Sequence, residues 1–177
     1  TIIFMVNFFI SKPNDEQSIN SYTITLQTSL GNIVFKTYNN DAPKTVANFV
    51  KLTNDGFYEG VIFHRVIDGF MIQGGDPTGT GMGGPGYTFD DELNPETASY
   101  QAGYQKGVVA MANAGANTNG SQFFIMVADA PHLPNDYTIF GRVISGQEIA
   151  DKIAKLPTDA NDRPLEPPVI EKVVISD

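Results

Sequence analysis

Residues 63–76 read FHRVIDGFMIQGGD, and the interpretation of the whole chain starts from this stretch. It contains parts of two short apolar runs, residues 61–66 and 70–73, which are typical of buried strands. Arg65 stands inside the first run, next to His64. A guanidinium is always charged, so its place in an apolar strand indicates either an acidic partner or a function.

Outside this stretch, the chain alternates short strand candidates with turns. Residues 22–26 alternate apolar and polar side chains, and residues 33–38 follow a turn, so the pair predicts a hairpin. Buried strands are also predicted at residues 108–111, 122–127 and 139–144, and a last strand is predicted at residues 169–175. Amphipathic helices are predicted at residues 41–56 and 147–154. Short strands with two isolated helices indicate a mainly β protein, a closed β-barrel with helices at its open ends.

The length of 177 residues suggests one domain, which we predict at residues 21–177. Residues 1–10 are mostly apolar but too short to span a bilayer, and residues 11–20 read as a polar linker. We expect residues 1–20 to form an extension that contacts another chain or a membrane surface. A remnant of a targeting segment and an expression artefact are the alternatives. A monomer is expected, in a cytoplasmic or an extracytoplasmic setting.

Composition argues against several classes of chemistry. The chain has no cysteine, which excludes thiol catalysis, disulfides and thiolate metal sites. A net charge of −9 argues against nucleic acid as a partner. The two histidines, His64 and His132, are not spaced to bind a metal from one helix, and a structural role is expected for His64. We therefore expect no metal and no other cofactor.

Two other patterns lack the context that their chemistry needs. Residues 79–84 match the glycine spacing of a dinucleotide-binding fingerprint, but no apolar strand precedes them and Pro85 follows where a helix is needed. The acids Asp90, Asp91 and Glu92 could form a carboxylate pair, but adjacent acids in a loop usually face solvent. We expect residues 79–84 to form a flexible surface loop and the acids at residues 90–92 to be solvated.

The remaining candidates suit an uncharged peptide ligand. A hydrophobic pocket with one cation and a few amides fits such a segment. The candidates of this kind are Arg65, Phe70, Met71, Gln73, Asn113, Gln122, Phe124 and Leu133. Phe70, Met71 and Phe124 could equally belong to the core, and Arg65 could pair with an acid. Periodicity alone does not separate these two interpretations.

Three stretches resemble the cyclophilin family of peptidyl-prolyl cis–trans isomerases: residues 63–76, residues 108–125 (VVAMANAGANTNGSQFFI) and residues 140–143 (FGRV). The order and spacing of these stretches agree with those of the family across residues 22–177. The resemblance implies an eight-stranded antiparallel β-barrel capped by two helices. It also implies an enzyme that accelerates rotation about Xaa-Pro bonds in protein folding. Its partners would be proline-containing peptides and unfolded or flexible protein segments.

Position by position, the resemblance implies a role for each candidate. Arg65 corresponds to the catalytic arginine, and Gln73, Asn113 and Phe124 complete the catalytic set. The substrate-binding set would be Phe70, Met71, Gly81, Ala112, Ala114, Gln122, His132, Leu133 and Tyr137. Such a site works without covalent chemistry, because it binds the twisted amide more tightly than either planar form. The alternative is a proline-binding module or chaperone in which turnover is incidental.

The sequence departs from the family at two positions of this site. Many members carry Trp where this chain has His132, and that residue shapes binding of the family's inhibitor, cyclosporin. Reduced cyclosporin affinity is therefore expected. Many members carry His where this chain has Tyr137, which offers a similar flat surface and a hydroxyl. Isomerase activity is expected to persist.

Overall fold

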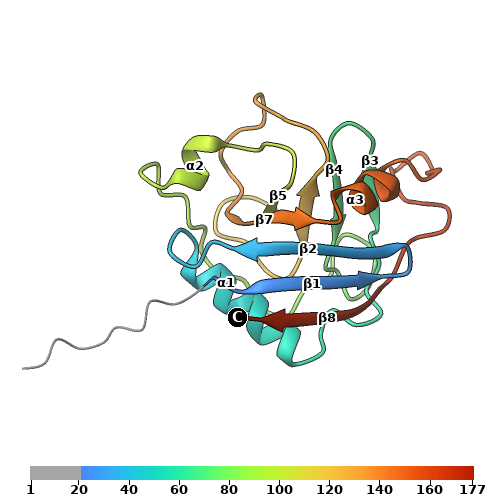
Figure 1. Cartoon of the computed structure of the whole chain (residues 1–177), viewed down its shortest axis with the longest axis horizontal. Coiled ribbons are helices and arrows are strands. Elements are labelled where there is room, and N and C mark those ends of the chain that lie inside the picture. Colours follow the sequence, from blue (N-terminus) through green and yellow to red (C-terminus); the bar gives the residue numbers. More distant parts are fainter. Residues whose placement is uncertain (1–20) are drawn as a thin grey trace, which may run out of the picture.

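The computed structural model describes residues 21–177, and its main element is one antiparallel sheet of eight strands (Figure 1). The strands are β1 (Thr23–Thr28), β2 (Gly31–Thr37), β3 (Arg65–Ile67), β4 (Met71–Gly74), β5 (Val108–Met111), β6 (Phe123–Met126), β7 (Ile139–Ser145) and β8 (Ile170–Ser176). Their order across the sheet is β3-β4-β6-β5-β7-β2-β1-β8. The predicted mainly β fold with eight antiparallel strands is confirmed. The predicted extension, residues 1–20, lies outside the described residues.

The sheet curls until its two outer strands, β3 and β8, come close together. Ile62, just before β3, forms an antiparallel bridge with Val169, just before β8. The N–H of Phe63 donates to the carbonyl of Pro168 at 3.0 Å. These bonds join the two edges at one end of the barrel, so the unpaired backbone that an open sheet would expose is partly covered.

Two helices occupy the predicted positions, and a third is present. The predicted pair are α1 (Pro43–Asn54), which packs against β8, and α3 (Gln147–Ala154), which packs against β2. The additional helix, α2 (Ala98–Ala102), has five residues and buries none of their side chains. Its sequence therefore carries no apolar stripe that could have revealed it. Within residues 21–177, no helix has the length and apolar character needed to cross a membrane.

The N-terminus of α1 is capped by an acid from a distant loop. Glu92 accepts hydrogen bonds from the N–H groups of Lys44 at 3.0 Å and Thr45 at 2.8 Å. Asp91 accepts one from the N–H of Asn117 at 2.7 Å. Asp91 and Glu92 are thus partly buried and hydrogen-bonded, so the expectation of fully solvated charges is wrong for these two, whereas Asp90 is exposed as expected. A carboxylate at this end of a helix satisfies N–H groups that have no partner within the helix, and here it also fixes the loop that carries it.

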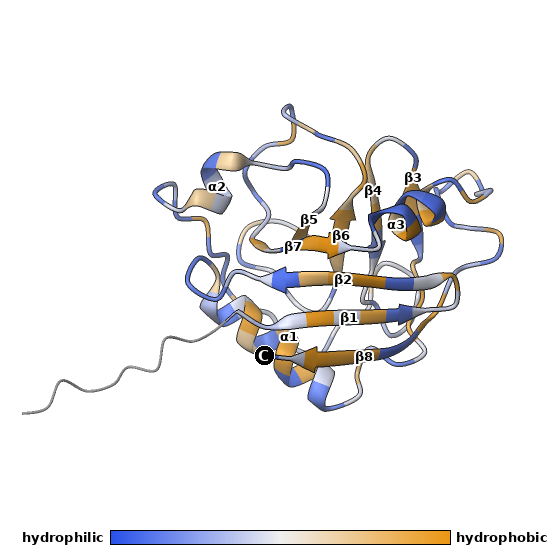
Figure 2. Cartoon of the chain, in the orientation of Figure 1, coloured by the Kyte–Doolittle hydropathy of each residue, from blue (hydrophilic) through white to orange (hydrophobic). Residues whose placement is uncertain are grey.

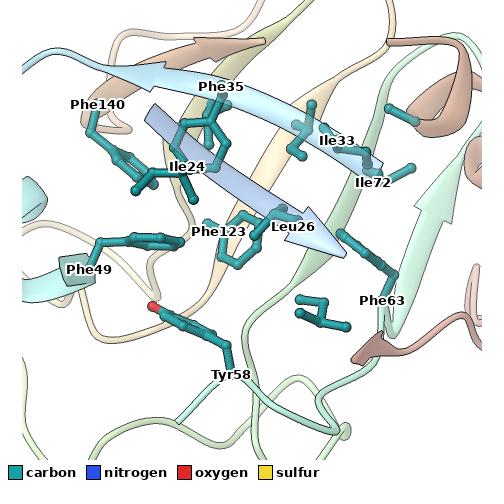
Figure 3. Close-up of a cluster of buried hydrophobic side chains, with 14 of the residues drawn as sticks. Ile24, Leu26, Ile33, Phe35, Phe49, Tyr58, Phe63, Ile72, Phe123 and Phe140 are labelled. Atoms are coloured by element: carbon teal, nitrogen blue, oxygen red, sulfur yellow. The ribbon is translucent and has the colours of Figure 1, made fainter. Parts of the chain in front are cut away.

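Large aromatic side chains fill the interior of the barrel (Figure 3). The ring of Phe49, from α1, lies 5.7 Å from the ring of Phe35 and 5.7 Å from that of Phe123, both edge to face. It also stacks on Tyr58 at 4.8 Å. Such ring pairs each add about 0.5–1.5 kcal/mol to the effect of burial. Phe49 thus anchors α1 to the strands that surround the core.

Strands β4, β5 and β6 are buried on both of their faces. Ile72 and Phe123 belong to the interior cluster, whereas their neighbours Met71 and Phe124 belong to a second cluster outside the barrel. Successive side chains of a strand point to opposite faces, so an unbroken apolar run fills both clusters at once. Figure 2 shows the ribbons of β5 and β6 largely in the hydrophobic colour. We call the second group the outer cluster; its buried members are Met71, Tyr104, Val108, Ala110, Phe124, Met126, Ala130 and Ile139.

Candidate functional site

Three candidate residues stand in one row across the sheet, beside the outer cluster. Arg65 of β3 lies opposite Gln73 of β4, and Gln73 lies opposite Phe124 of β6. Residues that face each other on neighbouring strands project to the same side of the sheet. Met71 stands two positions before Gln73 and therefore shares that side. The strand register alone thus gathers a cation, an amide, a thioether and an aromatic ring.

These side chains line a pocket of about 370 Å³, which we call the first pocket. Its lining is Arg65, Phe70, Met71, Gln73, Ala112, Asn113, Phe124, Leu133 and Tyr137. All nine belong to the predicted set of site residues. They come from β3, β4, β6, the turn between β3 and β4, and the loops that follow β5 and β6, so the fold brings together residues that are far apart in sequence.

An adjoining second pocket, of about 610 Å³, shares Gln73, Ala112 and Asn113 with the first. The predicted residues Gly81, Ala114 and Gln122 line this second pocket. Residues 81–88 of the glycine-rich loop, which spans residues 77–88, form most of its remaining wall. His132 is exposed and lines neither pocket, so its contact with a ligand stays a prediction.

The apolar wall of the first pocket is held from behind by Tyr104. The rings of Phe124 and Tyr137 meet edge to face at 5.5 Å, and the Tyr104 ring lies 6.3 Å from Phe124. The Tyr104 hydroxyl donates to the carbonyl of Tyr137 at 2.8 Å and accepts from its N–H at 2.9 Å. Burial raises the pKa of Tyr104 to about 12, so the hydroxyl stays protonated and makes both bonds.

The side-chain amides of the site are fixed by hydrogen bonds within the protein. The amide nitrogen of Gln73 donates to Gln122 Oε1 at 3.0 Å, and the amide nitrogen of Gln122 donates to the carbonyl of Gly81 at 3.0 Å. The amide nitrogen of Asn113 donates to the carbonyl of Asp136 at 2.8 Å. Gln122 therefore braces the glycine-rich loop against β4, and Asn113 is tied to the loop that leads to the apolar wall.

The glycine-rich loop is wrapped around the buried carboxylate of Asp76. This carboxylate accepts hydrogen bonds from the N–H groups of Thr78, Thr80, Gly81 and Gly83, at 2.7, 3.0, 2.6 and 3.1 Å. A Cβ at Gly83 would collide with Asp76 Oδ1, so the wrapping requires glycine there. Burial alone would raise the pKa of Asp76, but the hydrogen bonds, led by that of Gly83, outweigh it and lower the pKa to about 2. The loop is thus more firmly held than a flexible surface loop would be.

His64 lies behind this loop and is 6% exposed. Neither ring nitrogen has a hydrogen-bond partner among residues 21–177. Burial lowers the pKa of His64; Asp76 opposes this change, whereas Arg163 and Arg65 reinforce it. The imidazole is therefore neutral at neutral pH, and its structural role stays a prediction.

Arg65 supplies the charge of the first pocket. Its side chain is 44% exposed, and its Nε lies 3.5 Å from Asp162 Oδ2. The other lining residues of that pocket in the described part of the chain are uncharged. No group of His, Asp or Glu between residues 21 and 177 is arranged to hold a metal ion. The site therefore offers a permanent hydrogen-bond donor, an apolar wall and fixed amides.

Comparison with known families identifies this combination. Residues 23–175 match the family described as cyclophilin type peptidyl-prolyl cis-trans isomerase/CLD. The chain belongs to this cyclophilin family. The resemblance of the three sequence stretches is thereby confirmed, as is the predicted activity, peptidyl-prolyl cis–trans isomerisation.

Individual cyclophilins support the assignment over nearly the whole described chain. The peptidyl-prolyl cis-trans isomerase A of Mycobacterium tuberculosis is 53% identical over 171 residues, covering 87% of this chain and 92% of that protein. The isomerase ppi1 of Schizosaccharomyces pombe is 51% identical over 154 residues, covering 85% of this chain and 97% of that protein. A cyclophilin crystal structure from Cryptosporidium parvum superposes with a TM-score of 0.81 at 39% identity. The match covers 89% of this chain and 98% of that one. Another structure of that parasite protein was determined in the presence of the dipeptide Ala-Pro.

Sequence reasoning missed several residues that shape this cyclophilin site. Tyr104 and Asp162 lie outside the three resembling stretches, and no local pattern marks either of them. Met82 and Tyr87, on the glycine-rich loop, are 91% and 44% exposed. Their large apolar side chains in a glycine-rich loop were a signal that could have been used, because exposed apolar groups beside a hollow often mark binding surfaces.

We predict that Asp76→Asn makes stability less sensitive to acid. Because folding lowers the pKa of Asp76, its carboxylate stabilises the native state above the unfolded pKa, and this contribution is lost as pH falls from about 4 to about 2. Urea denaturation at about pH 7, 4 and 2 measures the effect. The variant should be less stable at neutral pH and lose less stability on acidification. Asp68→Asn, at an exposed position, is the control; an Asp76→Asn protein with the wild-type acid response would contradict the prediction.

Proposed function

We propose that this cyclophilin isomerises Xaa-Pro bonds by donating a hydrogen bond from Arg65 to the twisted amide, with no covalent intermediate. The observation that carries the proposal is the row of Arg65, Gln73 and Phe124 across β3, β4 and β6. This row places a permanent cation at the edge of an apolar, ring-lined pocket.

The reaction is rotation about a partial double bond. The barrier is about 18–20 kcal/mol, because the amide nitrogen shares its lone pair with the carbonyl. Twisting the bond returns the lone pair to the prolyl nitrogen, which can then accept a hydrogen bond. A donor directed at that nitrogen stabilises the twisted amide and neither planar form. Only such differential interactions accelerate the step.

Arg65 suits this role for chemical reasons. Its guanidinium stays protonated at every physiological pH and carries a planar fork of donors. The neighbouring pocket walls are apolar, and a charge beside a low-dielectric surface acts more strongly than in water. Preorganised donors of this kind are a large source of catalysis, because they need no rearrangement during the reaction.

The two pockets divide the substrate between them. The proline ring fits the first pocket, where it contacts the apolar walls, namely Phe70, Met71, Phe124, Leu133 and Tyr137. Gln73 and the backbone at Asn113 hold the chain beside the proline. The preceding residues lie toward the second pocket, along Gly81, Ala112, Ala114 and Gln122. With the proline held in the first pocket, the acyl carbonyl of the Xaa-Pro bond can rotate while the proline stays still.

The substrates are proline-containing peptides and unfolded or flexible segments of proteins. The Ala-Pro dipeptide used with the Cryptosporidium parvum relative supports this class. Arg65 is the charged residue of the first pocket and the rest of its lining is uncharged, so the proline ring is held there mainly by apolar contacts. An extended segment is required, because a folded chain would not present its backbone to both pockets.

Arg65→Ala tests the mechanism. The proposal predicts a loss of kcat/KM of about 100- to 1,000-fold in a protease-coupled assay with an Xaa-Pro peptide, the range found when one transition-state donor is removed. Arg142→Ala removes another half-buried arginine, from β7, and is the control. Wild-type activity in Arg65→Ala would mean that the site binds proline while the mechanism through Arg65 is wrong.

His132 is proposed to weaken cyclosporin binding, because its ring offers less apolar area than tryptophan. His132→Trp should therefore tighten binding by about 10-fold, a typical effect of an aromatic anchor at an interface. Isothermal titration of cyclosporin measures this. Asn135→Trp, at an exposed position in the same loop, should leave the affinity unchanged. Equal affinity of His132→Trp and the wild type would remove His132 from the inhibitor site.

A further inference from the structure

The catalytic arginine has a partner in a distant loop. Arg65 Nε lies 3.5 Å from Asp162 Oδ2, and the two side chains are 44% and 45% exposed. The backbone of the same residue binds the same strand, because the N–H of Val66 donates to the carbonyl of Asp162 at 2.8 Å. Asp162 therefore contacts β3 through both its main chain and its carboxylate, beside the first pocket.

The loop that carries Asp162 is held in one conformation by its own hydrogen bonds. Asp159 Oδ1 accepts from the N–H of Asn161 at 2.8 Å and of Arg163 at 3.1 Å, and the N–H of Asp159 donates to the carbonyl of Arg163 at 2.9 Å. Asp162 itself has a φ of 61°, in the left-handed region that Asp and Asn tolerate better than most residues. Its carboxylate is therefore presented to β3 by a turn that is already formed.

The same turn is tied to the glycine-rich loop. The Arg163 guanidinium donates to the carbonyl of Gly79, which belongs to the segment wrapped around Asp76. One side of the turn thus contacts the glycine-rich loop two residues before the part that lines the second pocket, and the other side contacts the arginine of the first pocket. A displacement of the turn would reach both pockets.

We propose that Asp162 is a positioning residue for catalysis: its carboxylate holds Arg65 Nε so that the remaining N–H groups of the guanidinium are directed at the substrate. This inference rests on the proposed role of Arg65. A long, half-exposed arginine has many rotamers, and each rotamer that turns toward solvent removes the donor from the reacting bond. An anchor at Nε reduces that loss and leaves both terminal nitrogens free, because guanidinium carries five N–H donors.

The competing interpretation is an exposed ion pair without influence on the reaction. Such pairs contribute little to stability, typically about 0–1 kcal/mol. Stability measurements therefore cannot separate the two interpretations, whereas the balance between kcat and KM can. Loss of an orienting contact lowers kcat, because the substrate still binds to the apolar walls.

Asp162→Asn tests the proposal, because asparagine keeps the size and the left-handed backbone while it removes the charge. We expect kcat to fall about 3- to 10-fold at low salt with KM nearly unchanged, the loss that a weakened anchor and a misplaced donor allow. In about 1 M NaCl, where the Debye length is about 3 Å, the difference between wild type and variant should shrink. Asp162→Gly, which also accepts this backbone, should lose the same activity.

The control is Asp55→Asn, which removes the same charge from the exposed ion pair of Lys51 and Asp55, where Lys51 Nζ and Asp55 Oδ2 lie 2.6 Å apart. It should behave as the wild type at every salt concentration. In an Arg65→Ala background, Asp162→Asn should have no further effect, because the two residues act as a unit.

The outcomes separate this inference from the mechanism on which it rests. Wild-type kcat in Asp162→Asn, combined with an impaired Arg65→Ala, would overturn the positioning role alone. Wild-type activity in Arg65→Ala would overturn the mechanism itself. An equal loss of kcat in Asp55→Asn would assign the effect of Asp162 to general electrostatics. So would an additive loss of kcat in the double variant of Arg65→Ala and Asp162→Asn. Either result would also overturn the positioning role.

Discussion

Burial of β4, β5 and β6 on both faces is the constraint on which the site depends. Their inward side chains, such as Phe123, complete the barrel core, and their outward side chains, such as Phe124, form the apolar wall of the first pocket. Neither face can relax without disturbing the other, because close-packed interiors transmit changes of volume. The pocket is therefore as rigid as the core that supports it, and a rigid pocket is what differential binding of a twisted amide requires.

The charged residue of this apolar site, Arg65, lies at the edge of the sheet. Arg65 lies on the outer strand β3, where its head reaches water while its backbone fixes its register opposite Gln73. An arginine in the middle of the sheet would have to give up the hydration of its guanidinium, which costs free energy. The proposed mechanism does not need this loss. The edge position also brings Arg65 within reach of Asp162, which belongs to a loop rather than to the sheet. The sheet thus fixes the register of Arg65, and the loop contacts its side chain.

Much of the fold and of the first pocket could be predicted from the sequence, for physical reasons that are visible in particular residues. The apolar runs at residues 108–111 and 122–127 correspond to β5 and β6, because strands buried on both faces need continuous hydrophobicity. The cation inside residues 63–76 marked the site. The helix cap by Glu92, the brace by Tyr104 and the pairing of Asp162 could not be predicted, because each links segments far apart in sequence through loops whose geometry no local pattern specifies.

The central claim is that the apolar pocket binds proline while Arg65 acts only on the twisted amide. Exchange NMR of an Xaa-Pro peptide with the wild type and with Arg65→Ala measures binding and on-enzyme exchange separately. The account predicts a peptide Kd within about 3-fold of the wild type and on-enzyme exchange at least about 100-fold slower. A variant that binds the peptide far more weakly, yet exchanges the bound peptide at the wild-type rate, would contradict it.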